Sequence, residues 1–281
     1  MKILLVTDGS NQAETAIRFG AQIAKRVSLP PTILAVGDQS KLSFSPGSED
    51  LLARAIELVG TNQEVHTLMQ AGDPFEQILC EAERGGYDLV IMGDRRPGNI
   101  IRRIIWRSTA NRVAEQASCS VLIVRGNAGA INRILLCDSG VEGSTLLSRL
   151  VVQLAELLEG EEDVTVLHVM SQVSAGPGVP GKQLRAGAKE LMEDQSPEGE
   201  ILEHDLQMLE TPGIHPTAKV RHGLVVDEIL SEARSGEYDL VVVGAHATAG
   251  ERRFLLDNIA HQILKSIDRP VLVVRKREDS T

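Results

Sequence analysis

Apolar and amphipathic stretches alternate along the chain. Runs typical of strands lie at 2–7, 32–36, 64–70, 87–93 and 121–125. Between the first two, apolar residues recur at three- and four-residue steps from 13 to 27, which is the spacing of an amphipathic helix. Strands that alternate with helices predict parallel βαβ units with right-handed crossovers, and thus a sheet covered by helices on both faces.

The same pattern occurs a second time. Residues 87–93 (Tyr-Asp-Leu-Val-Ile-Met-Gly) return at 238–244 as Tyr-Asp-Leu-Val-Val-Val-Gly, and the closing run at 121–125 returns at 271–275. A chain of 281 residues is long enough for two such domains. We therefore expect an α/β protein of two repeated doubly wound domains, 1–126 and 131–277, each with a five-stranded parallel sheet of order 3-2-1-4-5.

The second copy is longer than the first. The offset between copies is 130 from Asp8 to Asp138 but 151 from Gly93 to Gly244, so about 21 extra residues fall within about 171–213. There, a Gly/Pro-rich loop is followed by a helix, a break at Ser196-Pro197 and a second helix. The segment is either a surface elaboration or a lid or partner-binding face.

Two helix starts carry clear capping signals. Asp73 is placed to cap a helix, with Pro74 at its first position and Glu76 completing a capping box. Ser108 is placed to cap a helix that ends near Gln116.

Charge and aromatic content argue against a nucleic-acid partner. The formal net charge of the chain is −10. Residues 1–129 contain 14 basic residues (Lys and Arg) and 14 acidic residues (Asp and Glu), whereas the rest of the chain contains 15 basic and 25 acidic residues. The acidic excess therefore lies in the second half. Phe, Trp and Tyr make up only 2% of the chain, whereas a polyanion partner favours a basic face with aromatic stacking platforms.

The sequence indicates no membrane segment, no secretory signal and no metal site. No apolar run is long enough to span a membrane, and the first residues lack the pattern of a secretory signal, so we expect a cytoplasmic protein. The seven histidines show no metal-ligand spacing, and no metal site is expected. The three cysteines show no paired spacing, which favours reduced thiols packed in the core over redox sensing; they are Cys80, Cys119 and Cys137.

Polar residues follow the first and fourth strands of each copy. In an open parallel sheet of order 3-2-1-4-5, the switch point lies between these strands, and a ligand is expected outside their carboxyl ends. Asp8 and the loop after Gly93 then face one crevice, and Asp138 and the loop after Gly244 face the other. Either aspartate could instead cap or shape its own turn.

These residues carry a family resemblance. The whole chain, apart from the extra segment, resembles a tandem universal stress protein with two domains of the adenine-nucleotide α-hydrolase-like fold. The resemblance rests on four motifs: Val6-Thr7-Asp8-Gly9-Ser10, Gly72-Asp73-Pro74 with Ile78-Leu79, the stretch 87–93, and Cys119-Ser120-Val121-Leu122-Ile123-Val124-Arg125.

The resemblance implies a site for ATP or another adenine nucleotide. It places Asp8 near the adenine or ribose, the Val36 backbone at the adenine and the Gly72 loop nearby. Their counterparts in the second copy are Asp138 and two further positions, Val169 and Gly223.

ATP-binding members of that family share a motif of Gly, two residues, Gly, nine residues, Gly, then Ser or Thr. Glycines let backbone N–H groups approach phosphate oxygens, and the hydroxyl stands at a helix N-terminus. In the first copy Gly93 matches, Arg96 or Gly98 stands at the second glycine, Arg107 replaces the third and Ser108 keeps the hydroxyl. In the second copy Gly244 matches, and the other positions hold Ala247, Asp257 and Asn258. Because an aspartate repels phosphate, the second copy is the poorer candidate.

The first phosphate loop is rich in arginine. Its only acid is Asp94, and its arginines are Arg95, Arg96, Arg102, Arg103, Arg107 and Arg112. Two or three guanidinium groups could clamp an anion; alternatively they form a solvated face or pair with the acidic second half. Trp106 is expected to be a packing residue or an interface plug rather than a stacking platform.

No catalytic residues are indicated. The chain has no Walker motif, nucleophile elbow or kinase set, and His246 alone makes no catalytic case. The first hypothesis is a non-catalytic, cytoplasmic stress-response module with a degenerate nucleotide site. The alternatives are an adenine-nucleotide sensor that uses the first copy, and a slow nucleotide hydrolase.

The closing strands of the two copies indicate how the copies associate with each other. The resemblance implies that the edges at 121–124 and 271–274 pair, so that the two copies form an intramolecular pseudo-dimer. A further homodimer and an unidentified regulatory protein partner are compatible with this reading, and neither nucleic acid nor membrane is expected.

Overall fold

The computed structural model describes residues 1–37, 47–94, 108–126, 128–138, 144–158, 160–171, 186–245 and 258–275. The chain divides into two compact units. The first contains Met1–Ala130, Ala247–Leu256 and the C-terminal Asp268–Thr281, and the second contains Ile131–His246 with Asp257–Ile267.

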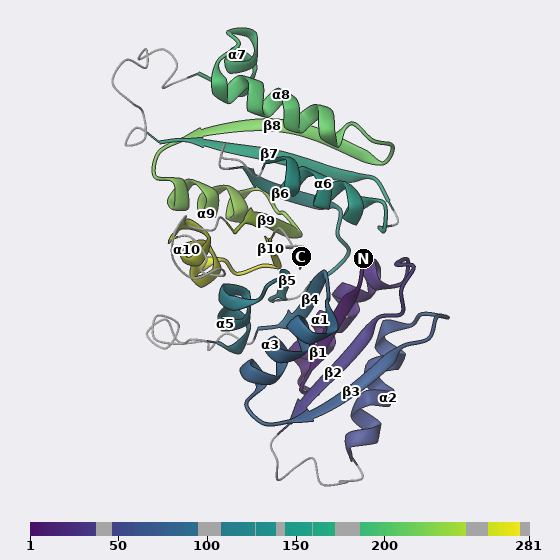
Figure 1. Ribbon diagram of the computed structural model, residues 1–281. Coiled ribbons are helices and arrows are strands. Elements are labelled where there is room, and N and C mark those ends of the chain that lie inside the picture. Colours follow the sequence, from purple (N-terminus) through teal and green to yellow (C-terminus); the bar gives the residue numbers. More distant parts are fainter. Residues whose placement is uncertain are drawn as a thin grey trace. The chain divides into compact units, whose positions relative to one another are not determined.

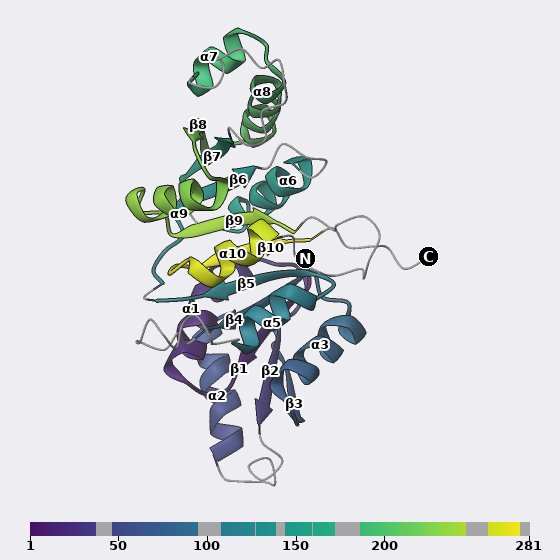
Figure 2. The same cartoon turned by 90° about the vertical axis from the view of Figure 1, so that its left-hand side faces the viewer.

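The first unit alternates strands and helices as predicted. Its elements are β1 (Ile3–Thr7), α1 (Asn11–Ala24), β2 (Thr32–Gly37), α2 (Gly47–Val59), β3 (His66–Ala71), α3 (Pro74–Gly85), β4 (Leu89–Gly93), α5 (Thr109–Gln116) and β5 (Ser120–Val124). The strands are parallel in the order β3-β2-β1-β4-β5. Helices α1 and α2 cover one face of this sheet and α3 and α5 the other (Figures 1 and 2).

The second unit repeats this plan with two additional helices. Its elements are β6 (Arg133–Asp138), α6 (Ser144–Ala155), β7 (Glu162–Met170), α7 (Ala188–Glu193), α8 (Pro197–Leu209), β8 (Ile214–His222), α9 (Val225–Ser235), β9 (Leu240–Gly244) and α10 (Asn258–Ser266). Strands β8-β7-β6-β9 lie in that order and are parallel. The predicted α/β class with doubly wound repeats is confirmed.

The last strand of the chain, β10 (Val271–Val274), belongs to the first unit. It pairs antiparallel with β5, with Val271 opposite Ile123 and Val273 opposite Val121. The expected pairing of the two closing strands is therefore confirmed.

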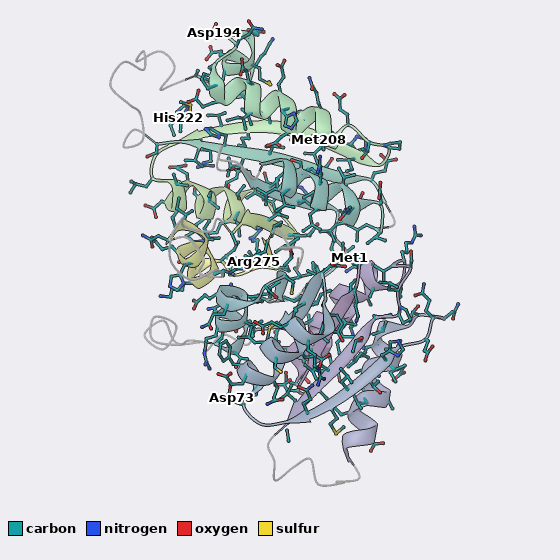
Figure 3. All side chains as sticks on the ribbon, in the orientation of Figure 1. Met1, Asp73, Asp194, Met208, His222 and Arg275 are labelled. Carbon is teal, nitrogen blue, oxygen red and sulfur yellow. The ribbon has the colours of Figure 1, made fainter. Side chains whose placement is uncertain are left out.

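Capping residues set the helix starts where the sequence predicted them. The Asp73 side chain accepts a hydrogen bond from the Glu76 backbone N–H at 3.1 Å, and Ser108 accepts one from Asn111 N at 3.1 Å. Ser196 caps α8 through Gly199 N at 3.0 Å, so the break at Ser196-Pro197 is also confirmed. Figure 3 shows Asp73 at the start of α3. Such caps typically stabilise a helix by about 1 kcal/mol each.

The strand runs form the cores. All residues of β1 and β5 are buried, whereas β3, at the edge of its unit, alternates between half-buried and exposed positions. Burying one Leu, Val or Ile side chain stabilises a fold by about 1.5–3 kcal/mol. No helix among the described residues is long and apolar enough to cross a membrane.

The cysteine prediction holds for two of three residues. Cys119 and Cys137 are buried, but Cys80 is exposed, so core packing is wrong for Cys80. Its place on α3 explains the difference, because it follows the buried Ile78 by two residues and residues two apart do not share a helix face.

The tyrosine of the repeated stretch packs in the same way in both repeats. A Cβ placed on Gly85 would lie 2.1 Å from the Tyr87 ring, and one placed on Gly236 would lie 2.1 Å from the Tyr238 ring. Only glycine leaves room for these rings. The repeated tyrosine is thus a core residue.

The aspartate of the repeated stretch ties strand starts together. Asp88 Oδ2 accepts from the Lys2 backbone N–H at 2.6 Å, and Asp239 Oδ2 accepts from Asn132 N at 3.0 Å and Arg133 N at 2.9 Å. These contacts lie at the amino ends of the strands. Of the repeated stretch, only its final glycine reaches the carboxyl edge.

Candidate functional site

Asp8 lies exposed in the turn after β1. Its Oδ1 accepts from Ser10 N at 2.9 Å, and Thr7 Oγ1 accepts from Gly9 N at 3.1 Å. Gly9 has a φ of 76°, a conformation that glycine adopts without strain. Asp8 therefore shapes its own turn, while its exposed carboxylate remains at the edge where the ligand is predicted.

Gly93 ends β4 directly against helix α1. A Cβ at this position would lie 2.6 Å from the Gln12 backbone oxygen. The Gln12 side chain, in turn, donates from Nε2 to the Val124 carbonyl at 3.1 Å. The close approach of α1 accounts for the glycine without any ligand.

Gly72 and Gly223 have matching backbone conformations. Their φ angles are 136° and 153°. Gly72 N donates to Gly37 O and Gly223 N donates to Met170 O, both at 3.2 Å. The loops after β3 and β8 are thus built alike. Near them, Val36 is buried and Val169 is half-buried, as their places near the ends of β2 and β7 require.

A buried ion pair occupies the edge beyond Gly93. Asp94 Oδ2 accepts from Arg125 Nε at 2.8 Å and lies 2.8 Å from Arg125 Nη2. The same Nη2 donates to Asn111 Oδ1 at 2.6 Å, in the first turn of α5. The side chains of Arg125 and Asp94 are only 1% and 3% exposed. The two charges therefore face each other where they are shielded from solvent, and electrostatic interactions are stronger there than in water.

The sequence analysis named Arg125 and Asp94 separately but did not predict that they form an ion pair. The register of the two strands brings them together, because Gly93 lies opposite Val124 in the parallel ladder. The next residues along both strands are Asp94 and Arg125. A buried acid and a buried base at adjacent strand ends favour an ion pair.

The positions predicted for the phosphate hydroxyl differ between repeats. Ser108 is 6% exposed, and its hydroxyl caps α5. Asn258 is exposed at the start of α10, and its Oδ1 accepts from Gln262 Nε2 at 2.9 Å. Both side chains already take part in hydrogen bonds within their own helices.

Arg275, the counterpart of Arg125, makes different contacts. Its Nη2 donates to the carbonyl oxygens of Ala114 and Glu115, both at 2.9 Å, at the end of α5. Burial lowers the pKa of Arg275 to about 10. Where the first repeat has Asp94, the second has Ala245.

Some predicted site residues lie outside the described residues. These are Arg96, Gly98 and Arg107 of the first repeat, Ala247 and Asp257 of the second, the side chain of Asp138, and also Trp106 and His246. Gly244 ends β9 at the equivalent edge of the second unit. Of the six arginines in the first loop, Arg112 is described, and its guanidinium lies 3.7 Å from the centre of the Phe75 ring. Among the described residues, no group of three potential ligands could hold a metal ion.

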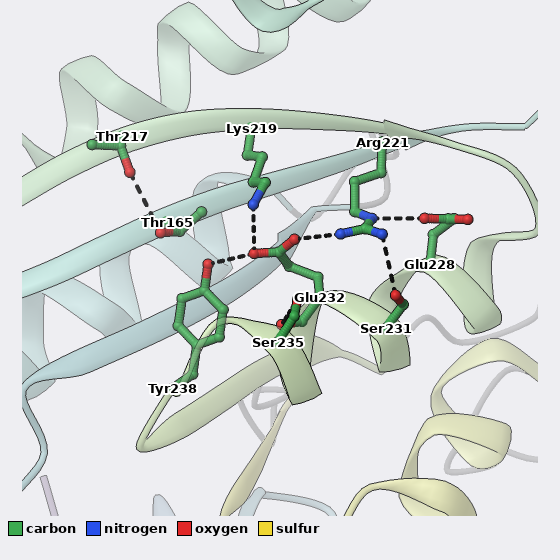
Figure 4. Close-up of polar contacts among 9 residues, drawn as sticks. All are labelled: Thr165, Thr217, Lys219, Arg221, Glu228, Ser231, Glu232, Ser235 and Tyr238. Carbon is green, nitrogen blue, oxygen red and sulfur yellow. Dashed lines mark hydrogen bonds and ion pairs between the residues drawn. The ribbon is translucent and has the colours of Figure 1, made fainter.

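Sequence reasoning also missed a charged network on α9 and β8, drawn in Figure 4. Glu232 is 1% exposed and accepts from Lys219 at 2.9 Å, Arg221 at 2.7 Å and the Tyr238 hydroxyl at 2.8 Å. Burial raises the pKa of Glu232, but these hydrogen bonds outweigh burial and hold the pKa below its usual value. Burial raises the pKa of Tyr238 to about 12.

The additional helix α8 is anchored by buried polar groups. Asp205 is fully buried and accepts from Ser148 Oγ on α6 at 2.8 Å. Burial lowers the pKa of His168 on β7, against the opposing charges of Glu198 and Asp205 on α8. Figure 3 shows His222 at the end of β8, where its Nε2 lies 3.1 Å from the Ala186 carbonyl.

Fold and site together define a protein built from two copies of one doubly wound α/β domain. The chain matches the universal stress protein family over residues 1–125 and again over 130–275. It belongs to the universal stress protein family.

Curated relatives agree with this assignment. A universal stress protein of Mycolicibacterium smegmatis is 25% identical over 98% of this chain and 97% of its own length. The universal stress protein MJ0531 of Methanocaldococcus jannaschii is 30% identical over 44% of this chain and 81% of its own length.

Solved structures share the fold along nearly the whole chain. The functionally unknown protein PA1789 of Pseudomonas aeruginosa superposes with a TM-score of 0.72 at 19% identity and covers 98% of this chain and 92% of its own. A universal stress protein of Archaeoglobus fulgidus gives a TM-score of 0.62 at 18% identity, over 98% of this chain and 96% of its own.

Proposed function

We propose that this universal stress protein is a non-catalytic regulatory module of the stress response whose nucleotide-binding motifs are degenerate. The observation that carries the proposal is the state of Ser108. This residue is the only hydroxyl retained at the two phosphate positions, yet it is buried and its oxygen caps α5. The sequence departures at Arg107, Ala247 and Asp257 support the same conclusion.

The three free thiols suit a protein that acts in the reducing interior of a cell. Cys80, Cys119 and Cys137 are free thiols, and structural thiols persist in a reducing compartment. We therefore place the protein in the cytoplasm, acting through a regulatory protein partner. The pairing of β5 with β10 supports an intramolecular pair of domains.

A sensor of adenine nucleotides is the second candidate. Asp8 favours it, because its carboxylate is exposed at the edge where the nucleotide is expected. The matching conformations of Gly72 and Gly223 also support a retained nucleotide fold.

Mass spectrometry of the nucleotide released when the purified protein is denatured tests the proposal. We expect no bound adenine nucleotide and no ATP binding in a titration of the wild type. Bound nucleotide, with affinity lost in Asp8→Ala, would establish the sensor instead. Turnover of ATP above that of buffer would contradict a non-catalytic role.

A further inference from the structure

The Asp94–Arg125 pair has the composition of an occupied anion site. Arg125 presents two N–H donors to one carboxylate oxygen, each at 2.8 Å. Guanidinium groups bind carboxylates and phosphates through charge-assisted contacts of this length. The anion in this site is part of the chain itself.

The surroundings of Arg125 call for an anion. Its Nη2 reaches Asn111 in the first turn of α5, and a helix N-terminus carries a partial positive charge. A guanidinium beside such a terminus, with a side chain only 1% exposed, is unfavourable unless a negative group neutralises it. Asp94 supplies the negative group. Its backbone N–H donates to the carbonyl of Val124 at 3.0 Å, and Val124 directly precedes Arg125 in the chain, so the carboxylate is held close to the guanidinium.

The second repeat lacks this acid. Ala245 stands in place of Asp94, and Arg275 turns to the carbonyl oxygens of Ala114 and Glu115. These carbonyl groups belong to α5 of the first repeat, so Arg275 binds neutral acceptors outside its own repeat, whereas Arg125 binds a carboxylate within its own.

We propose that Asp94 is the residue that decides ligand specificity in the first repeat. Its carboxylate takes the place of a ligand phosphate at Arg125 and keeps phosphate-bearing ligands away from the N-terminus of α5. This inference rests on the proposed function, and it adds the Asp94 side chain to the features that oppose triphosphate binding in the first repeat. A ligand phosphate would have to displace a buried partner that is tethered in place, which lowers its affinity by on the order of a hundredfold or more.

The variant Asp94→Asn tests the proposal, because asparagine keeps an oxygen acceptor for Arg125 but removes the charge. Asp163→Asn is the matched control, since it makes the same change at an exposed position. Melting temperature is measured in inorganic phosphate from 0 to about 20 mM, with ionic strength held constant by KCl. Anions that bind only the folded state raise the melting temperature.

We expect Asp94→Asn to melt several degrees below the wild type in chloride and to recover in phosphate. Its apparent affinity for phosphate should exceed that of the wild type at least tenfold. The wild type and Asp163→Asn should show the same small response to phosphate. A phosphate response of Asp94→Asn no larger than theirs would overturn the proposal and leave Asp94 a purely structural partner of Arg125.

A double variant, Asp94→Leu with Arg125→Met, covers the case in which Asp94→Asn does not fold. Removing both charges should give a folded protein whose melting temperature does not rise with phosphate beyond the small response of the wild type. If the double variant folds while Asp94→Asn stays unfolded even in phosphate, the buried guanidinium cannot take an anion from solution, and the proposal is wrong. Tight ATP binding by the wild type would instead refute the proposed function, whereas failure of Asp94→Asn alone refutes only this inference.

Discussion

The two repeats agree at the amino ends of their strands and differ at the carboxyl edge. Tyr87 and Tyr238 each lie against a glycine, and Asp88 and Asp239 each accept backbone hydrogen bonds from the neighbouring strand. At the other edge, the counterpart of Asp94 is an alanine. Positions that hold the sheet together are thus shared, whereas the residue that follows the last glycine of the repeated stretch, at the edge where a ligand is predicted, has diverged.

This contrast separates two kinds of repeated residue. A pattern that returns in both copies, such as residues 87–93 and 238–244, reports mostly on packing. The functional difference lies in residues that do not repeat. Fold similarity therefore says little about the ligand, because function depends on the site.

The largest expected effect comes from the glycines under the repeated tyrosines. Gly85→Ala and Gly236→Ala each place a Cβ 2.1 Å from a tyrosine ring, and overpacking of this kind costs about 2–3 kcal/mol. Urea unfolding of each variant measures the loss. Gly129→Ala is the control, because nothing lies within 4 Å of its added Cβ. Equal stability of Gly85→Ala and Gly129→Ala would show that the tyrosine does not pack as described.

A smaller and unequal effect is expected at the two buried glutamates. Glu232→Gln leaves Lys219 and Arg221 facing a neutral group, so we expect a loss of about 2 kcal/mol. Glu81, its counterpart, contacts Gln70 at 3.0 Å and Arg84, whose side chain is 70% exposed. Glu81→Gln should therefore cost only about 1 kcal/mol. Chemical denaturation of both variants checks the difference, and a larger loss for Glu81→Gln would contradict it.

The smallest effect is a dependence on pH in the second unit. Burial lowers the pKa of His168 below the ordinary histidine value of 6.5, so the unfolded chain binds the proton more readily than the folded one. Stability that His168 contributes is complete above about pH 6.5 and is lost as the pH falls toward the lowered pKa. Melting curves between pH 7.5 and 5.5 should show a shallower pH dependence for His168→Gln than for the wild type.

The exposed His66 provides the control for this measurement. His66→Gln should leave the pH dependence of the wild type unchanged, because its ring stays in solvent. An identical pH profile for wild type and His168→Gln would mean that the buried imidazole does not resist protonation.

Periodicity and capping predicted most of the fold. The strands repeat runs of Leu, Val and Ile, and the caps at Asp73, Ser108 and Ser196 are local signals, so both can be recognised without tertiary contacts. Membership of a tandem family followed from motifs in the same order in both halves. Exposed Cys80 was missed because an apolar neighbourhood in sequence says little about the outward face of a helix.

The candidate site was harder to predict, because its parts come from separate elements. Asp94, Asn111 and Arg125 are brought together by β4, α5 and β5, and no single stretch contains them. Likewise, Glu232 lies on α9, and its partners come from β8 and from the residues before β9. A motif search reads neighbours in sequence, whereas these contacts depend on strand register and helix packing. The assignment of Asp8, Val36, Gly72 and Gly93 to a nucleotide stays a prediction.

A crystal structure of the wild type grown with millimolar ATP and Mg²⁺ tests the central claim most directly. The account predicts an intact pair, with Asp94 Oδ2 still 2.8 Å from Arg125 Nε and no triphosphate at the N-terminus of α5. A triphosphate bound there, with Arg125 turned from Asp94 to a phosphate oxygen, would contradict it.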